Sequence, residues 1–113
     1  MIVRVLTCAE TELAEAVAYY NEQRPGLGFE FAVEVKSAFA RIVDFPVAWP
    51  KFSNRSRRCL LDRFPYGVLY HKSHDEIIVL AIMHLRLGPT RWADRLRETI
   101  GKKSATRRPR RPV

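Results

Sequence analysis

Four basic residues have the types and the spacing that chemistry on a phosphate group would need. His84 and Arg86 lie two positions apart at the end of an apolar run, so both side chains would leave a strand on the same face. Arg58 and Arg63 precede them and would approach from the neighbouring strand. Cleavage of RNA without a metal ion needs a group that moves protons and positive charges that hold the phosphate, and histidine is suited to proton transfer near neutral pH. If the protein is a nuclease, these four residues are its catalytic candidates.

Each of the four also has a simpler interpretation. A histidine at the end of an apolar strand is most often a hydrogen-bonded structural residue, and strand arginines are often solvated or paired with an acidic helix face. An arginine just beyond a buried strand, such as Arg86, often anchors a partner's carboxylate. The residue types alone therefore leave binding and nuclease chemistry both open.

The cysteines and the remaining histidines do not indicate a metal site. No two of these side chains have the spacing that metal ligands usually have. We therefore expect free thiols, no metal and no cofactor. The residues considered are Cys8, Cys59, His71, His74 and His84.

Composition points to one globular domain. The chain has 113 residues, of which 47% are hydrophobic, which is enough to build a core without disulfides. The longest apolar run, residues 77–83, is too short to cross a bilayer. The first residues do not have the form of a signal peptide, so we expect a cytoplasmic protein with no membrane partner.

Positive charge is concentrated toward the end of the chain. Residues 1–46 carry four basic and seven acidic residues, which gives −3, and residues 47–100 carry ten and five, which gives +5. Residues 101–113 carry six basic residues and no acidic one. We therefore expect a folded domain over residues 1–100 and a basic, disordered tail over residues 101–113. Such a tail is either simply solvated or held against nucleic acid or an acidic partner.

Periodicity and turn signals predict an α+β domain in the order β-α-α-β-β-β, with a short helix at the end. Residues 7–10 read as a capping box that begins the first helix, and Pro25 and Gly26 end it. The short link between the two helices requires an antiparallel helical hairpin, packed on an antiparallel sheet. The expected strands are residues 2–6, 57–64, 67–72 and 77–84, and the expected helices are residues 7–24, 28–45 and 90–100.

The expected core joins the second helix to the last strand. Phe31, Phe39 and Ile42 belong to an apolar stripe at helical spacing. Residues 77–83 are apolar on both faces, which is typical of a central strand. We therefore expect this strand to lie inside the sheet and the stripe to face it.

Four short segments, in this order, resemble one protein family. The chain is similar to the RelE/ParE superfamily of toxins from type II toxin–antitoxin systems, and most similar to its ParE-like branch. The segments are residues 15–20, residues 25–28 with Phe29 and Phe31, residues 57–58 with 63–66, and residues 81–86 with Pro89, Trp92 and Arg95.

The resemblance implies a small bacterial toxin, of the kind associated with plasmid stabilization, that is neutralised by a cognate antitoxin in a hetero-oligomer. ParE-like members inhibit DNA gyrase by binding, whereas RelE-like members cleave messenger RNA on the ribosome. RelE-like enzymes have clustered basic residues and often a tyrosine near the C-terminus, whereas in this chain no tyrosine follows residue 70 and no lysine lies between Lys51 and Lys72. We therefore expect the ParE-like activity, with the ribosome-dependent endoribonuclease and a plain nucleic-acid-binding module as alternatives. The expected antitoxin-binding residues are Arg58, Arg63 and Arg86, and the expected target-binding residues are Arg86, Trp92, Arg95 and His84.

Overall fold

The computed structural model describes residues 1–86, which form four strands and two helices. Within this part of the chain, no helix is long and apolar enough to cross a membrane. The expected helix at residues 90–100, the basic tail and the domain boundary at residue 100 lie outside the described residues. The elements are β1 (Ile2–Val5), α1 (Thr7–Gln23), α2 (Leu27–Asp44), β2 (Arg57–Leu60), β3 (Tyr66–Lys72) and β4 (Glu76–His84).

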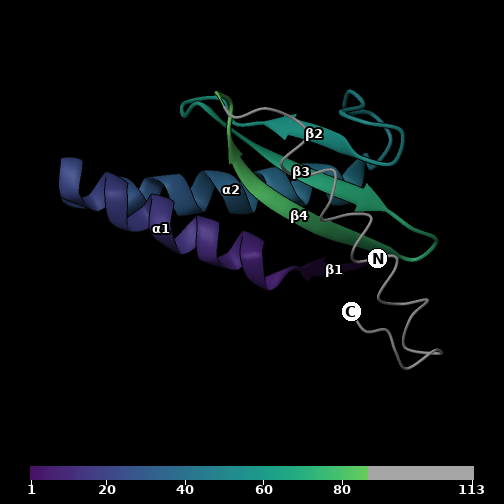
Figure 1. Cartoon of the computed structure of the whole chain (residues 1–113), viewed down its shortest axis with the longest axis horizontal. Coiled ribbons are helices and arrows are strands. Elements are labelled where there is room, and N and C mark those ends of the chain that lie inside the picture. The colour runs from purple at the N-terminus through teal and green to yellow at the C-terminus, as the bar shows by residue number, and fades with distance from the viewer. Residues whose placement is uncertain (87–113) are drawn as a thin grey trace, which may run out of the picture.

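The four strands form one sheet in the order β1-β4-β3-β2, with both helices on one side of it (Figure 1). β2, β3 and β4 are joined by short connections and pair antiparallel, as their spacing predicted. β1 pairs parallel with β4. The helical hairpin leads from β1 to β2, which runs in the same direction as β1, and the two antiparallel reversals through β3 give β4 that direction again. The predicted α+β class and element order are confirmed, and the sheet is antiparallel except at β1.

The helical hairpin depends on two glycines, Gly26 between the helices and Gly28 in the first turn of α2. Gly26 has a φ of 89°, a left-handed conformation that glycine adopts without strain, and it reverses the chain after α1. Gly28 lies against α1, where an added Cβ would collide with the Val17 carbonyl oxygen and approach the Asn21 side chain to 2.7 Å. The Gly28 N–H also donates a hydrogen bond to Asn21 Oδ1 at 2.8 Å. The absent side chain at Gly28 therefore lets the two helices approach closely.

The sheet is apolar on both faces. Leu69 pairs with Ala81 but Tyr70 pairs with Val79, so Leu80 is the extra residue of a β-bulge. The bulge places Leu80 and Ala81 in the same cluster, on the face opposite the helices. The helix-side cluster contains Phe31, Val35, Ala38, Ile42, Val68, Tyr70, Ile77, Val79 and Ile82, and the opposite cluster contains Leu69, Ile78, Leu80, Ala81 and Met83.

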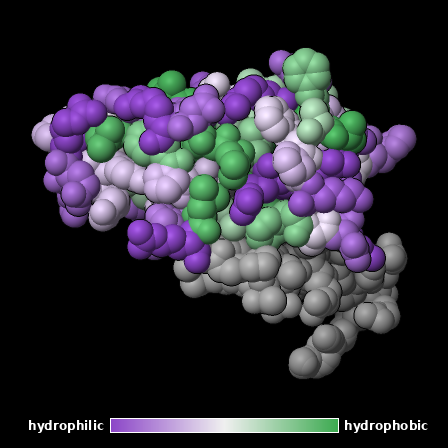
Figure 2. All heavy atoms as spheres, turned by 90° about the horizontal axis from the view of Figure 1, so that it is seen from above, coloured by the Kyte–Doolittle hydropathy of each residue, from purple (hydrophilic) through white to green (hydrophobic). Residues whose placement is uncertain are grey.

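The predicted core is confirmed. Phe31 and Ile42 are buried in the helix-side cluster, and Phe39 packs against it while partly exposed. Every residue from 77 to 83 is buried, as expected for a central strand. On the face seen from above in Figure 2, hydrophobic residues are also exposed and lie interspersed with hydrophilic ones.

The predicted capping box does not form. Leu6 occupies the N-cap position of α1 and there is no side-chain cap hydrogen bond. The Leu6 N–H donates to the Val79 carbonyl oxygen at 3.1 Å, so pairing with β4 extends beyond β1 and fixes where the helix begins. Thr7 is consequently the first helical residue rather than the cap.

The strand expected over residues 57–64 ends earlier, at Leu60. The backbone N–H groups of Asp62 and Arg63 donate to the carboxylate of Glu34 on α2 instead of to a neighbouring strand. A side chain of the helix thus replaces the sheet as the hydrogen-bond partner of this segment.

Candidate functional site

His84 lies at the end of β4 on the helix side of the sheet. It is paired with Tyr66, and the two rings pack edge to face with their centroids 5.1 Å apart. Tyr66 in turn contacts Phe31 of α2 at a centroid distance of 4.9 Å. The Nδ1 atom of His84 accepts a hydrogen bond from the Arg86 N–H at 3.2 Å, which places the proton of a neutral ring on Nε2. These contacts fit the structural interpretation of the histidine.

Arg86 lies in a turn beyond the sheet and is exposed. The expectation that His84 and Arg86 share a strand face is wrong, because β4 ends at His84 and the alternation of side chains ends with it. The turn is held by a hydrogen bond from the Leu85 N–H to the Pro65 carbonyl oxygen at 3.0 Å. Arg86 is thus available to a partner just past the buried strand.

Arg58 lies on the opposite face of the sheet from His84. Its neighbour Cys59 is buried on the helix side, so Arg58 points to the other side. Its stem crosses Gly67, where an added Cβ would meet the Arg58 Cγ at 2.9 Å. Its guanidinium carbon lies 5.1 Å from the centre of the Phe52 ring. β3 separates β2 from β4, so the expectation that Arg58 approaches His84 from the neighbouring strand is wrong.

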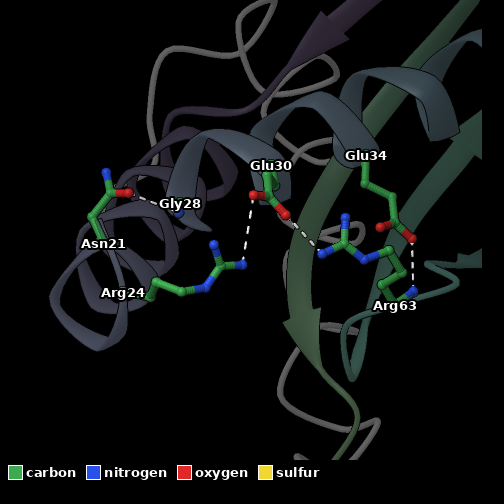
Figure 3. Close-up of polar contacts among 6 residues, drawn as sticks. All are labelled: Asn21, Arg24, Gly28, Glu30, Glu34 and Arg63. Atoms are coloured by element: carbon green, nitrogen blue, oxygen red, sulfur yellow. Dashed lines mark hydrogen bonds and ion pairs between the residues drawn. The ribbon is translucent and has the colours of Figure 1, made fainter. Parts of the chain in front are cut away.

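Arg63 lies in the connection after β2, and carboxylates of α2 hold it (Figure 3). Its Nη2 atom is 2.7 Å from Glu30 Oε1, and its backbone N–H donates to Glu34 Oε2 at 2.9 Å. Glu30 also pairs with Arg24 at 3.5 Å. The hydrogen bond from Arg63, together with Arg24, holds the pKa of the Glu30 carboxyl below its ordinary value. We call Arg24, Glu30, Glu34 and Arg63 the Arg63 corner.

The structure therefore does not gather the four catalytic candidates into one cluster. His84 is on the helix side, Arg58 on the opposite face, Arg63 against α2 and Arg86 in a turn. Because Arg58 is on the other face of the sheet and Arg63 is engaged by Glu30, the four side chains do not form the single cluster that the sequence predicted. No group of residues within 1–86 could hold a metal ion. Trp92 and Arg95, the other expected target-binding residues, lie outside the described part of the chain.

A cluster of cations at the start of β2 and the end of β3 was not recognised from the sequence. Lys51, Arg55, Arg57, His71 and Lys72 line one pocket there. The available signal was the absence of any Asp or Glu between residues 45 and 61. The contribution of His71 and Lys72 depends on the register of β3 with β2, which pairs Tyr70 with Arg57 and is not evident from sequence spacing.

Comparison with known proteins gives a structural match. No family model and no curated protein matches the chain. A solved chain from the chromosomal ParDE toxin–antitoxin system of P. aeruginosa is similar, with a TM-score of 0.68 and 16% sequence identity. The match covers 75% of this chain and 96% of that chain. The chain therefore shares its fold with a chain of a ParDE toxin–antitoxin system, which is the fold that the resemblance of its sequence implied.

Proposed function

We propose that the protein is the toxin of a type II toxin–antitoxin system, that it inhibits DNA gyrase by binding, and that it catalyses no reaction. The observation that carries this proposal is the likeness of its fold to a chain of a ParDE system over nearly the whole length of that chain. Gyrase as the target follows from the resemblance of the sequence to ParE-like toxins. The protein would act in the bacterial cytoplasm, where gyrase is found.

The positions of the basic residues support binding rather than RNA cleavage. A metal-independent nuclease needs proton-transferring and positive groups within reach of one scissile phosphate. His84 and Arg58 lie on opposite faces of the sheet, and Arg63 is engaged by Glu30. An inhibitor needs only a stable contact surface. Arg86, exposed beyond β4, is the described residue that we assign to target contact, together with Trp92, Arg95 and the support of His84.

The proposed partner in the cell is an antitoxin with an apolar and acidic C-terminal segment. Arg58 and Arg86 offer positive groups to that segment, whereas Arg63 already has a carboxylate partner within this chain. Exposed ion pairs contribute little affinity, so apolar contacts must supply most of it. On the outward side of α2, Phe29 and Val33 are 67% and 68% exposed and lie one helical turn apart. We expect them to be covered in the complex with the antitoxin.

Inducible expression in a bacterial host tests the proposal. Expression of the unchanged protein should arrest growth and induce the DNA damage response before protein synthesis falls. His84→Ala should leave toxicity nearly intact, because the contacts of the imidazole within residues 1–86 are structural: it accepts a backbone hydrogen bond and packs on Tyr66. Arg86→Ala should weaken toxicity without unfolding the protein, because the side chain is exposed.

The same experiment distinguishes gyrase inhibition from ribosome-dependent cleavage of messenger RNA. An immediate loss of protein synthesis without a DNA damage response, abolished by His84→Ala, would contradict gyrase inhibition and favour a ribosome-dependent endoribonuclease.

A further inference from the structure

A pocket of about 250 Å³ opens between the 46–56 connection and the end of β3, at the opposite end of the sheet from His84. Its lining contains four Lys or Arg side chains, one histidine and no Asp or Glu. We call it the cationic pocket. Its lining residues are Val47, Lys51, Asn54, Arg55, Ser56, Arg57, His71 and Lys72.

The connection that forms one wall of the cationic pocket is firmly attached to the sheet. The Tyr70 hydroxyl donates to the Pro46 carbonyl oxygen at 2.6 Å, and burial raises the pKa of Tyr70 to about 12, so this donor keeps its proton. Arg57 Nη1 donates to the Trp49 carbonyl oxygen at 2.7 Å.

The tip of the connection is fastened in the same way. The Phe52 N–H donates to the Ser56 carbonyl oxygen at 2.8 Å, and the Ser53 and Ser56 hydroxyls are 2.6 Å apart. The His71 Nδ1–H donates to the Arg55 carbonyl oxygen at 2.6 Å, which joins the connection to β3. The wall is therefore set in place before any ligand arrives.

The cations of the pocket are not neutralised within the described part of the chain. The ion pairs among residues 1–86 involve Arg4, Arg24 and Arg63, none of which lines the pocket. Lys51, Arg55 and Lys72 are exposed, and Arg57 is half-buried. Four positive groups held around one small space, without a counter-ion among residues 1–86, attract a ligand with several negative charges.

We propose that the cationic pocket binds phosphate groups of a nucleic-acid backbone. Arginine and lysine are the side chains that most often contact backbone phosphates. Binding to a nucleic acid also releases the counterions condensed on its backbone, which adds affinity that a short acidic peptide does not provide. The pocket lining has one apolar side chain, Val47, so an acidic peptide would find little apolar surface to bury there. The lining has no Phe, Tyr or Trp on which a base could stack, so we infer contact with the backbone independent of base sequence.

The test uses the purified full-length protein and fluorescent single-stranded oligonucleotides of two unrelated sequences. Lys51→Gln/Arg55→Gln removes two exposed cations of the pocket, and Arg24→Gln/Lys36→Gln removes two cations on the helical hairpin as a control with the same charge change. Each variant retains residues 101–113, so binding by those basic residues is common to both. The pocket variant should bind both oligonucleotides on the order of tenfold more weakly at physiological salt, and its salt slope should fall by about 1 to 2.

The control variant should change affinity by about twofold or less. Asn54→Glu, which adds a carboxylate to the pocket lining without removing a cation, should weaken binding in the same direction as the pocket variant. Thermal melts confirm that each variant is folded. Equal losses in the pocket and control variants would overturn the proposal, because binding would then follow net charge alone.

Inorganic phosphate and poly-glutamate serve as comparison ligands, which show whether the pocket prefers a nucleic-acid backbone to a small anion or an acidic peptide. Amide and imidazole NMR signals of Arg55, Arg57 and His71 should shift with the oligonucleotide at micromolar concentration and with inorganic phosphate only at millimolar concentration. Equal affinity for inorganic phosphate would make this a small-anion site and contradict the proposal. Poly-glutamate of equal charge should compete poorly, and full competition at equal concentration would instead indicate an acidic peptide ligand.

Discussion

Two basic regions of the molecule use the same residue types in opposite ways. In the Arg63 corner, Glu30 lies between Arg24 and Arg63, with its oxygens 3.5 Å and 2.7 Å from the two guanidinium groups. The lining of the cationic pocket contains four Lys or Arg side chains and no carboxylate. The first region stabilises the connection of α2 to the sheet, and the second is available to a ligand. The comparison shows that the position of the acidic residues decides which arginines are paired with a carboxylate among residues 1–86.

The difference originates in the sequence of α2. Glu30 and Glu34 are one helical turn apart, so both side chains reach the connection after β2. The acidic residues of α2 end with Asp44, and residues 45–61 contain none. The pocket is built from this segment together with the end of β3.

The largest expected effect comes from breaking the core that supports both regions. Ile42→Asp places a carboxylate where Ile42 is 1% exposed, which costs roughly 5 kcal/mol or more, comparable with the whole stability of a small domain. We expect loss of cooperative thermal unfolding, measured by circular dichroism. Val33→Asp, on the same helix but 68% exposed, should keep the cooperative transition. A melting temperature of Ile42→Asp within a degree or two of the parent would show that the core face is wrongly assigned.

A less destabilising substitution should loosen the Arg63 corner and leave the cationic pocket almost unchanged. Gly28→Ala adds a Cβ that meets the Val17 backbone, and pushing α2 away from α1 should cost about 1–3 kcal/mol in the free energy of unfolding. Hydrogen exchange of the Arg63 amide, which is bonded to Glu34, should accelerate. Exchange of the Phe52 amide, beside the cationic pocket, should change much less.

Ser37→Ala provides the control for Gly28→Ala, because it changes an exposed position of α2 without adding a buried atom. Equal acceleration at both amides in Gly28→Ala would mean that the two regions do not open independently.

The smallest expected change in stability comes from removing the charge that distinguishes the Arg63 corner from the cationic pocket. Glu30→Gln removes the carboxylate that pairs with both Arg24 and Arg63 and leaves Glu34 as the remaining carboxylate of the Arg63 corner. The pKa of Glu30 is lowered in the folded state, so its contribution to stability is present above its ordinary value of 4.5 and is lost as pH falls through the folded pKa. The variant should melt a few degrees or less below the parent at pH 7.

The difference in melting temperature for Glu30→Gln should shrink as the pH falls below 4.5 and through the lowered pKa of the folded state. Glu22→Gln, at an exposed glutamate near the end of α1, controls for the removed charge. A difference that persists unchanged to pH 2 would show that the ion pairs do not stabilise the corner.

Much of the fold could be predicted because local patterns agree with the tertiary structure. The apolar stripe that includes Phe31 and Ile42 indicated the correct face of α2, and the doubly apolar run at 77–83 indicated the central strand. The parallel pairing of β1 could not be predicted, because a four-residue strand carries no signal for the direction of its neighbour. The early end of β2 depends on Glu34, which is 28 residues from Asp62.

The candidate site was less predictable than the fold. Placing Arg58 and His84 together required the strand order, and the actual order inserts β3 between their strands. The pairing of Arg63 with an acidic helix face was one of the alternatives that residue types suggested, and the structure selects it. The cationic pocket was missed because it joins residues from a connection and a strand that are brought together only by tertiary structure.

The most direct test of the proposed function compares two assays of the purified protein, DNA supercoiling by gyrase and cleavage of messenger RNA on programmed ribosomes. The unchanged protein and His84→Ala should inhibit supercoiling to within about twofold of each other, and neither should cleave messenger RNA, because His84 is held as a structural residue. Ribosome-dependent cleavage that His84→Ala abolishes, with supercoiling unaffected, would contradict the account.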